Sequence, residues 1–397
     1  MLSRRRFLAI AVAAFASFLA ACAAAIPSSA RPPPSSPSAR PPNPSPSPSR
    51  TPTPTPVAPL RERIGQMVVV GFRGRTAAEA GPAFADVAAG RIGGVVLFSR
   101  DQLTGEPRNI QSPEQLATLT ADLQAASARW PLLISVDQEG GQVARLGPAF
   151  GFPATRSAEE LGALDDLSMT RAQASSIAAT LVAAGINLNL APAVDLAVNP
   201  TNPIIAEVGR SFGADPARVI AHATAFIEAH HDAGVKCTLK HFPGHGSSTG
   251  DTHLGVVDVT DTWSEVELEP FAALIGAGIT DAVLTAHVFN RTLDPDHPAT
   301  LSRPTVGGIL RGDLGFDGAV LSDDLQMGAI RDAYGFEEAL ALAIEAGIDL
   351  LVVANQLVYE PDVAARMVDL VEGFVTSGRI AESRIDESVE RIGRLRN

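Results

Sequence analysis

Cysteine and lysine are the scarcest reactive residues of this 397-residue chain. It has two cysteines, Cys22 and Cys237, and two lysines, Lys236 and Lys240, against 29 arginines. A single pair of cysteines cannot form the dense disulfide framework of small secreted domains. We therefore expect the folded part of the chain to depend on its hydrophobic core, with Cys237 a buried and unreactive side chain.

The chain also lacks a long apolar run at its start. The uncharged apolar segment 7–21 has 15 residues, whereas a membrane-spanning helix needs about 20. It follows three arginines, at positions 4–6, and small residues come after it, which is the pattern of an export signal. Residues 3–8 fit the twin-arginine export pattern, and a Sec route is the alternative.

The segment Leu19–Cys22 resembles the lipobox of bacterial lipoproteins. This predicts that residues 1–21 are a signal peptide, that Cys22 becomes acylated, and that the mature protein is exported and anchored by lipid to the cell membrane, facing the cell wall or periplasm. Several acyl chains would hold it firmly, because one chain alone binds a membrane only marginally. The alternative is an ordinary signal peptide with an incidental cysteine.

Residues 22–59 are predicted to be a disordered linker. The stretch 27–59 holds 14 prolines, with serine, threonine and arginine between them. Such a composition buries too little apolar surface to fold and favours the extended polyproline II conformation. At about 3.1 Å per residue the linker reaches at most about 100 Å, so we interpret it as a stalk.

Acidic residues are absent from the first 58 positions, and the remainder is strongly acidic. Residues 60–397 contain all 44 acids and 25 of the bases, for a formal charge of −19. No basic cluster stands out, which disfavours nucleic-acid binding. A small neutral substrate suits this charge better than a polyanion. We expect a monomer.

The pattern of residues 60–397 predicts one α/β domain. Short apolar runs alternate with longer segments of helical period, as in parallel sheets with crossover helices. Eight such units favour a closed (β/α)8 TIM-type barrel, and a doubly wound open sheet is the alternative. No Gly-x-Gly-x-x-Gly motif follows a strand, so a dinucleotide cofactor has no support. The expected strands are Gln66–Phe72, Gly93–Phe98, Leu132–Val136, Ile186–Leu190, Val235–Leu239, Ala282–Leu284, Ala319–Leu321 and Asp349–Val353. The expected helices are Ser112–Ala126, Thr170–Ala184, Asp215–Ala233, Ser264–Ala277, Phe336–Ala346, Pro361–Gly378 and Ser383–Arg396.

Reactive side chains gather after these strands and not before them. A barrel's active site lies at the carboxyl ends of its strands, so we expect the clusters to converge. Lys240, one of only two lysines, stands at such an end, where its ammonium could bond sugar hydroxyls. The clusters are 137–145, 191–195, 209–213, 240–253, 285–287 and 322–324.

Three of these segments carry a family resemblance. The run 240–253, Lys-His-Phe-Pro-Gly-His-Gly followed by Asp251-Thr-His253, is the most specific of them. Together with 137–145 and 322–327 it resembles the signature set of the glycoside hydrolase family 3 β-N-acetylhexosaminidases, over essentially all of residues 60–397. The resemblance implies a (β/α)8 barrel and a retaining, two-step mechanism that needs no cofactor.

The resemblance also assigns catalytic residues. Asp323 matches the nucleophile that forms a covalent glycosyl-enzyme. His253 matches the acid/base, paired with Asp251, and an imidazole can both give and take a proton near neutral pH. Asp324 is expected to point elsewhere. Glycines around the His253 loop predict that it is mobile and closes over bound substrate.

The residues matched to sugar binding lie in the same clusters. His287 is a weaker candidate, and Asp195 is expected to support the site. The sequence departs from the family at Gln142, Ser247 and Thr252, which leaves the preference for the leaving group open. The main binding candidates are Asp137, Arg145, Arg210, Lys240 and His241.

These observations predict an exo-hydrolase of terminal β-linked N-acetylglucosamine, acting on small oligosaccharides from peptidoglycan. The alternatives are a β-glucosidase, an enzyme that passes the sugar to phosphate, and a non-catalytic sugar-binding lipoprotein. A metal site formed by His241, His245, Asp251 and His253 is a further alternative, but the spacing matches no common zinc motif. We therefore expect no metal.

Overall fold

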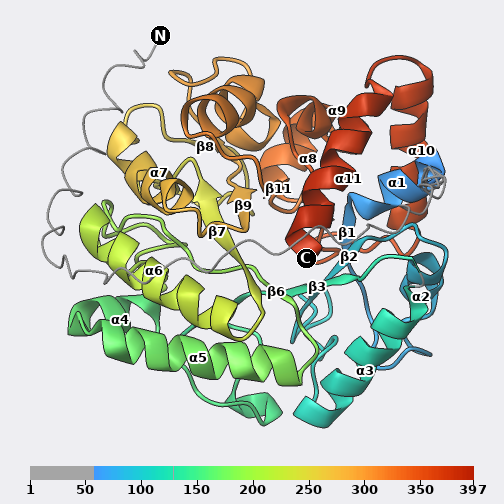
Figure 1. The fold of residues 1–397 in the computed structure, drawn as a ribbon. Coiled ribbons are helices and arrows are strands. Elements are labelled where there is room, and N and C mark those ends of the chain that lie inside the picture. Colours follow the sequence, from blue (N-terminus) through green and yellow to red (C-terminus); the bar gives the residue numbers. More distant parts are fainter. Residues whose placement is uncertain (1–57, 128) are drawn as a thin grey trace, which may run out of the picture. The chain divides into compact units, whose positions relative to one another are not determined.

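The chain folds into a barrel of eight parallel strands surrounded by helices (Figure 1). The computed structural model describes residues 58–127 and 129–397. The predicted signal peptide, Cys22 and the linker up to residue 57 lie outside the described residues. The barrel strands are β1 (Val68–Gly71), β2 (Gly94–Leu97), β3 (Leu133–Val136), β6 (Leu188–Asn189), β7 (Lys236–Phe242), β9 (Ala282–Thr285), β11 (Ala319–Leu321) and β12 (Leu351–Val353).

The sheet closes on itself almost completely. Its strand order is β11-β9-β7-β6-β3-β2-β1-β12, with parallel pairing throughout. A parallel bridge between Leu321 and Leu350 then joins the two ends of this order. The predicted (β/α)8-type barrel is confirmed, and the open-sheet alternative is wrong because the first and last strands of the order meet.

The helices form the outer layer, and local sequence sets where several of them begin. Ser112 accepts a hydrogen bond from Gln115 N at 3.2 Å and caps α3, with Pro113 in its first turn. Asp215 caps α6 in the same way. The helices are α1 (Leu60–Gln66), α2 (Gly81–Ala88), α3 (Pro113–Ala126), α4 (Ala158–Leu164), α5 (Leu167–Ala183), α6 (Pro216–Asp232), α7 (Glu269–Gly276), α8 (Gly328–Tyr334), α9 (Phe336–Ala346), α10 (Val363–Thr376) and α11 (Glu382–Arg396).

The structure departs from the expected elements in several places, and the helices α1, α2, α4 and α8 were not expected. β7 runs on to Phe242, three residues beyond its predicted end, so Lys240 and His241 belong to the strand itself. The expected helix Ser264–Ala277 is a short 3-10 turn, Glu265–Leu268, followed by α7. A π-helix at Pro304–Asp313 was not expected. Short strands at the rim were also missed: β4 (Gln138–Gly140) pairs with β5 (Val143–Ala144), and β8 (Val257–Asp258) pairs with β10 (Val288–Phe289).

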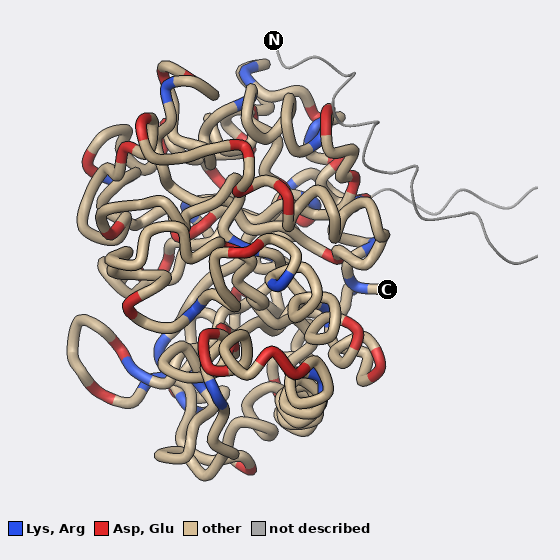
Figure 2. The backbone as a smooth tube through the Cα atoms, turned by 90° about the vertical axis from the view of Figure 1, so that its left-hand side faces the viewer, with Lys and Arg blue, Asp and Glu red and all other residues tan. Residues whose placement is uncertain are grey.

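The core lies inside the barrel and between the strands and helices. Val68, Val95, Ile134 and Val320, on four different strands, are fully buried. This explains the continuously apolar strand sequences, since both faces of such a sheet are covered. Charged residues of both signs are spread along the chain (Figure 2). None of the described helices is long and apolar enough to cross a membrane.

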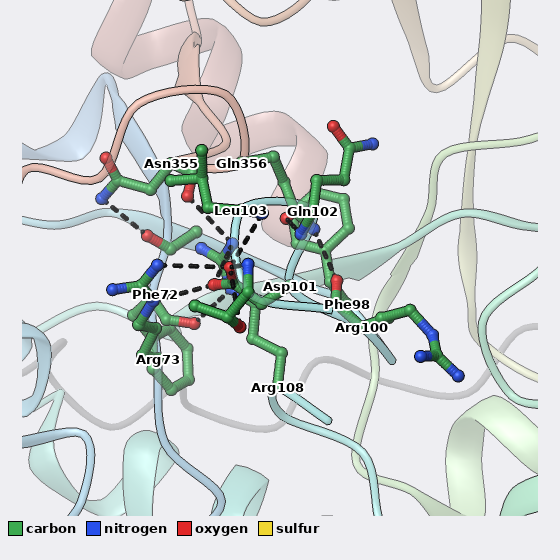
Figure 3. A network of polar contacts seen from close by, with 12 residues as sticks. Phe72, Arg73, Phe98, Arg100, Asp101, Gln102, Leu103, Arg108, Asn355 and Gln356 are labelled. Atoms are coloured by element: carbon green, nitrogen blue, oxygen red, sulfur yellow. Dashed lines mark hydrogen bonds and ion pairs between the residues drawn. The ribbon is translucent and has the colours of Figure 1, made fainter. Parts of the chain in front are cut away.

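A buried arginine, Arg108, forms hydrogen bonds to the backbone at the carboxyl ends of β1 and β12 (Figure 3). The Arg108 guanidinium donates to Phe72 O, beyond β1, at 2.7 Å and to Ala354 O, beyond β12, at 2.9 Å. Asp101 lies 3.5 Å from Arg108 and accepts from Arg73 Nε at 2.8 Å. Burial lowers the pKa of Arg108 to about 10, so the guanidinium keeps its charge at neutral pH. The network therefore fixes one wall of the barrel mouth.

Candidate active site

A cavity of about 340 Å³ opens at the carboxyl ends of the strands. Side chains from seven of the eight barrel strands, or from the loops that follow them, line it, as expected for a barrel of this type. The wall fastened by Arg108 supplies Gln102 and Gln356, and Gln356 is held by hydrogen bonds to Gln102 N at 2.9 Å and Arg100 O at 3.0 Å. The polar residues that line the cavity include Gln102, Asp137, Gln142, Arg145, Arg210, Lys240, His241, His245, Asp251, Thr252, His253, Asp323, Asp324 and Gln356.

One side of the cavity is a buried ionic cluster. Lys240 Nζ lies 2.7 Å from Asp137 Oδ1 and 2.7 Å from Glu139 Oε1. Arg210 donates two hydrogen bonds to Glu139, at 2.9 and 2.7 Å. Arg145 approaches Asp137 at 3.5 Å. These predicted binding residues therefore lie together and hold one another in place. We call Asp137, Glu139, Arg210 and Lys240 the ionic cluster.

The charges of the ionic cluster are fixed by their neighbours. Burial would raise the pKa of the Asp137 carboxyl, but Lys240 and Arg145 outweigh burial and hold that pKa well below its usual range. Burial acts likewise on Glu139, where Arg210 and Lys240 lower the pKa to about 2. Both carboxyl groups are therefore ionised at neutral pH and cannot donate a proton to a leaving group.

Asp195 supports this side of the cavity from below. Its Oδ2 lies 2.7 Å from His241 Nδ1, and its Oδ1 accepts from His245 N at 2.8 Å. The other ring nitrogen of His241 lies 3.0 Å from Arg210 Nη2. Burial would raise the pKa of Asp195, but His241 and His245 outweigh burial and lower this pKa to about 2. Its expected supporting position is therefore present, with His241 held between Asp195 and Arg210.

The Asp251–His253 pair lies on the loop that follows β7. His253 Nδ1 is 2.6 Å from Asp251 Oδ1, which also accepts from His253 N at 2.9 Å. The His253 side chain is 47% exposed, in contrast to the buried ionic cluster. Because Asp251 occupies Nδ1, the Nε2 atom is the one left for a substrate. Thr252, between the two, points inward and is buried.

Asp323 and Asp324 follow β11 and have different surroundings. Asp324 Oδ1 accepts from Gln326 N at 3.1 Å and from Ala354 N at 3.0 Å, and burial raises the pKa of its carboxyl to about 6. Asp323 Oδ1 accepts from Asp324 N at 2.8 Å. Burial would raise the pKa of Asp323, but His287, His241 and His253 outweigh it and lower the pKa. Asp323 is thus the ionised carboxylate facing the cavity.

Two residues singled out from the sequence lie away from the cavity wall. His287 is fully buried, with Nδ1 2.8 Å from Thr300 Oγ1 and Nε2 3.0 Å from Asp324 O. Both ring nitrogens are thus used within the protein, so we expect His287 to support the Asp323 segment and not to touch sugar. Cys237 is buried, and burial raises the pKa of its thiol well above the usual value.

Two buried carboxyl residues beside the site, Glu139 and Glu267, were not singled out by sequence reasoning. Glu139 could have been found, because it stands two residues after Asp137 and alternate residues of an extended segment share a face. Glu267 could also have been found: with Phe271 and Leu274 it forms an i, i+4, i+7 series on one helix face. His245 was named from the sequence only as a possible metal ligand, and its buried Nδ1 has no hydrogen-bond partner among the described residues.

The described residues contain no group of three or more histidine, cysteine, aspartate or glutamate side chains arranged to hold a metal ion. The four residues of the alternative metal site are divided between other contacts. His241 is bound to Asp195 and Arg210, and Asp251 is bound to His253. The arrangement instead suits a carboxylate nucleophile and a separate proton donor on either side of a bound sugar.

The geometry agrees with comparisons to known proteins. The family model for the glycosyl hydrolase family 3 N-terminal domain matches residues 59–395. The chain belongs to glycosyl hydrolase family 3. One relative, the β-hexosaminidase of Tolumonas auensis, is 39% identical over 275 residues, which are 66% of this chain and 76% of the relative. This family 3 chain is accordingly a glycosidase.

Solved family 3 structures share the same fold. A β-N-acetylhexosaminidase from Beutenbergia cavernae superposes with a TM-score of 0.76 at 34% identity, covering 85% of this chain and 98% of that one. A β-N-acetylglucosaminidase from Paenibacillus superposes with a TM-score of 0.78 at 38% identity. That match covers 85% of this chain and spans 62% of the Paenibacillus protein.

Proposed function

We propose that this chain is a retaining, exo-acting β-N-acetylhexosaminidase that removes terminal, non-reducing β-linked N-acetylglucosamine. The observation that carries the proposal is one cavity lined by Asp323, by the Asp251–His253 pair and by three members of the ionic cluster, Asp137, Arg210 and Lys240. The names of the relatives, β-hexosaminidase and β-N-acetylglucosaminidase, support the preference for an acetamido sugar.

In the first step Asp323 is the nucleophile. Its ionised carboxylate attacks the anomeric carbon, and a bond forms between that carbon and an Asp323 oxygen as the bond to the leaving oxygen breaks. His253 gives its Nε2 proton to the leaving oxygen, while Asp251 holds the opposite ring nitrogen. The ionic cluster binds the sugar hydroxyls and fixes the ring before the reaction.

In the second step the glycosyl-aspartate is hydrolysed. His253, now neutral, takes a proton from a water molecule, the water oxygen bonds to the anomeric carbon, and Asp323 leaves as a carboxylate. Two displacements restore the original configuration, which makes the enzyme retaining.

The surroundings of the other carboxyl groups in the site favour an imidazole as the acid/base. Most retaining glycosidases use a second carboxyl group for this role. Here Asp137 and Glu139 have lowered pKa values, and Asp324 is bonded to two backbone N–H groups. Among the described residues that line the cavity, His253 combines partial exposure with a ring nitrogen, Nε2, that Asp251 does not occupy.

The cavity also favours exo-action on a small neutral sugar. Its volume of about 340 Å³ lies at the lower end of the usual range for ligand sites, about 300–1,000 Å³. That space suits one terminal sugar with part of its leaving group. Cationic and anionic groups of the ionic cluster neutralise one another, so they offer hydrogen bonds to hydroxyls without selecting a charged ligand.

We further propose that the enzyme is lipid-anchored outside the cytoplasmic membrane and acts on peptidoglycan fragments. Support comes from the apolar segment 7–21, the lipobox at Leu19–Cys22 and the proline-rich linker. In the bacterium, Cys22→Ser should move the protein from the membrane fraction to the soluble fraction. Product analysis should then detect N-acetylglucosamine released from muropeptide-derived disaccharides. A membrane-bound Cys22→Ser protein would contradict the anchor.

Hydrolysis rates with aryl substrates test the specificity. We expect release from aryl N-acetyl-β-glucosaminide, with little release from the matching β-glucoside and no requirement for phosphate. Faster turnover of the glucoside would contradict the acetamido preference. A glycosyl phosphate product, with rate dependent on phosphate, would instead identify a phosphorylase.

A further inference from the structure

The acid/base loop lies directly against the segment that carries the nucleophile. Gly328 N, at the start of α8, donates to His253 O at 3.2 Å, and Ala329 N donates to Thr252 O at 3.3 Å. Only four residues separate Asp323 from Gly328. The backbone on either side of the catalytic imidazole is therefore attached to the same short segment that positions the nucleophile.

Gly328 is not required by its own backbone conformation. It occupies a helical position, and its φ angle lies outside the left-handed range that favours glycine. Alanine would stabilise a helical position by up to about 1 kcal/mol relative to glycine. Local helix preference therefore gives no reason for a glycine at this site.

A close approach of the loop gives that reason. A Cβ atom at position 328 would lie 3.0 Å from His253 O, 3.1 Å from Leu254 C and 3.1 Å from Leu254 O. These distances are below ordinary van der Waals contact, so one of the two segments would have to move. The start of α8 is buried, whereas His253 and Leu254 are exposed. The loop is therefore the part that would give way.

The loop has a second inward contact. Thr252 is buried, with Oγ1 3.4 Å from His245 Nε2. At the root of the loop, Glu267 Oε2 accepts from Gly246 N at 2.9 Å and from Ser247 N at 3.3 Å. These contacts hold the base of the loop and its inner face. The contact with Gly328 is the one beside His253.

We propose that Gly328 is a positioning residue for the acid/base. The absence of a side chain at this position lets the His253 backbone rest on the start of α8, and this sets the reach of the imidazole toward the leaving oxygen. The inference depends on the proposed role of His253 as acid/base. It adds that the distance between proton donor and nucleophile is set by the close backbone approach of the His253 loop to the start of α8.

The test is leaving-group dependence in Gly328→Ala. For a disaccharide or alkyl glycoside, which needs protonation, we expect kcat/KM to fall by about 10-fold, since a misplacement of about 1 Å can already cost about 10²-fold. For an aryl glycoside with an activated leaving group the loss should stay within about 2-fold. The thermal midpoint should not fall, because alanine favours the helix.

Two further variants make the outcome decisive. Gly373→Ala, at an exposed position of α10, places its Cβ where no described atom outside the neighbouring helix backbone lies within 4 Å, and it should leave both rates unchanged. In a His253→Ala background, adding Gly328→Ala should cause no further loss, because the acid that it positions is already gone.

Each result assigns the failure to one claim. The positioning role would be overturned if Gly328→Ala lowered kcat/KM equally on both substrates or on neither. A further loss of kcat/KM in the His253→Ala background would also overturn it. None of these results would change the role assigned to His253. If His253→Ala itself lowered kcat/KM equally on both substrates, the acid/base assignment would fail instead.

Discussion

The two sides of the cavity are built in opposite ways. The ionic cluster is buried, and its members contact one another at 2.7–2.9 Å. The Asp251–His253 pair makes two comparably short contacts, at 2.6 and 2.9 Å, but both lie within the pair, and its imidazole is about half exposed. Groups that grip the sugar are therefore fixed before it arrives, and the group that moves a proton lies on a loop.

This difference follows from the two tasks. Binding hydroxyls benefits from groups already oriented, and buried charges are stable only when each has several partners. A proton donor must instead meet the leaving oxygen, then water, and must exchange its proton with solvent between turnovers. Partial exposure and a loop position serve that purpose.

The largest effect should come from the nucleophile. Asp323→Ala should lower turnover by at least about 10⁴-fold, because it removes the covalent step. Its unfolding free energy should stay near wild type, since Asp323 accepts a single short-range backbone hydrogen bond. Steady-state rates and chemical denaturation measure the two quantities.

The neighbouring aspartate is the matched control for that variant. Asp324→Ala leaves the N–H groups of Gln326 and Ala354 unpaired in a buried place and should cost about 1–3 kcal/mol of stability. A variant of Asp323 that unfolded as readily as the Asp324 variant would contradict the division of roles.

The next largest effect should be on the unfolding free energy, where a substitution in the ionic cluster should cost more than one in the Asp251–His253 pair. Glu139→Ala leaves Lys240 and Arg210 without a shared buried partner and should lower the unfolding free energy by about 3–5 kcal/mol. Asp251→Ala removes an exposed contact and should cost less than about 1 kcal/mol. Urea titration of both variants measures the gap. Similar costs would mean that the two sides are not built differently.

The effect of removing the acid/base should depend on the leaving group of the substrate. His253→Ala should lower kcat/KM by about 10²-fold or more on a disaccharide and much less on an activated aryl glycoside. Asp251→Asn is a milder companion, because its amide can still contact the ring but carries no charge to stabilise the imidazolium. If His253→Ala lowered kcat/KM by the same factor for all leaving groups, His253 would not be the acid/base.

A pH dependence of stability should come from the loop root. Burial raises the pKa of Glu267 from 4.5 to about 7, so the folded protein holds this proton more tightly than the unfolded chain. The unfolding free energy should therefore fall as pH rises between about 4.5 and 7, by up to about 1 kcal/mol per pH unit. Denaturation of wild type and Glu267→Gln across this window isolates the contribution. A constant difference between the two proteins would contradict it.

The sequence was sufficient for the barrel and for most cavity residues. Strand runs such as Gly93–Phe98 and Ala319–Leu321 are apolar on both faces, which predicts strands covered on both sides. Because barrel strands share one direction, the clusters after them had to meet at one rim. That reasoning predicted the joint position of Asp137, Lys240 and Asp323.

The remaining features depend on contacts between distant segments. Nothing near His287 in the sequence indicates that Thr300 and Asp324 occupy its ring nitrogens. Gly328 resembles any helical glycine until the His253 loop is placed against it. The extension of β7 through His241 likewise depends on pairing with β9, whose partner for Phe242 is Thr285.

Trapping the covalent intermediate tests the central claim most directly. A 5-fluoro glycosyl fluoride that keeps the acetamido group slows both steps, and its good leaving group lets the first outpace the second. After incubation, peptide mass spectrometry should find the sugar attached to Asp323, in wild type and in His253→Ala. A label on another residue, or turnover by Asp323→Ala at the wild-type rate, would contradict the account.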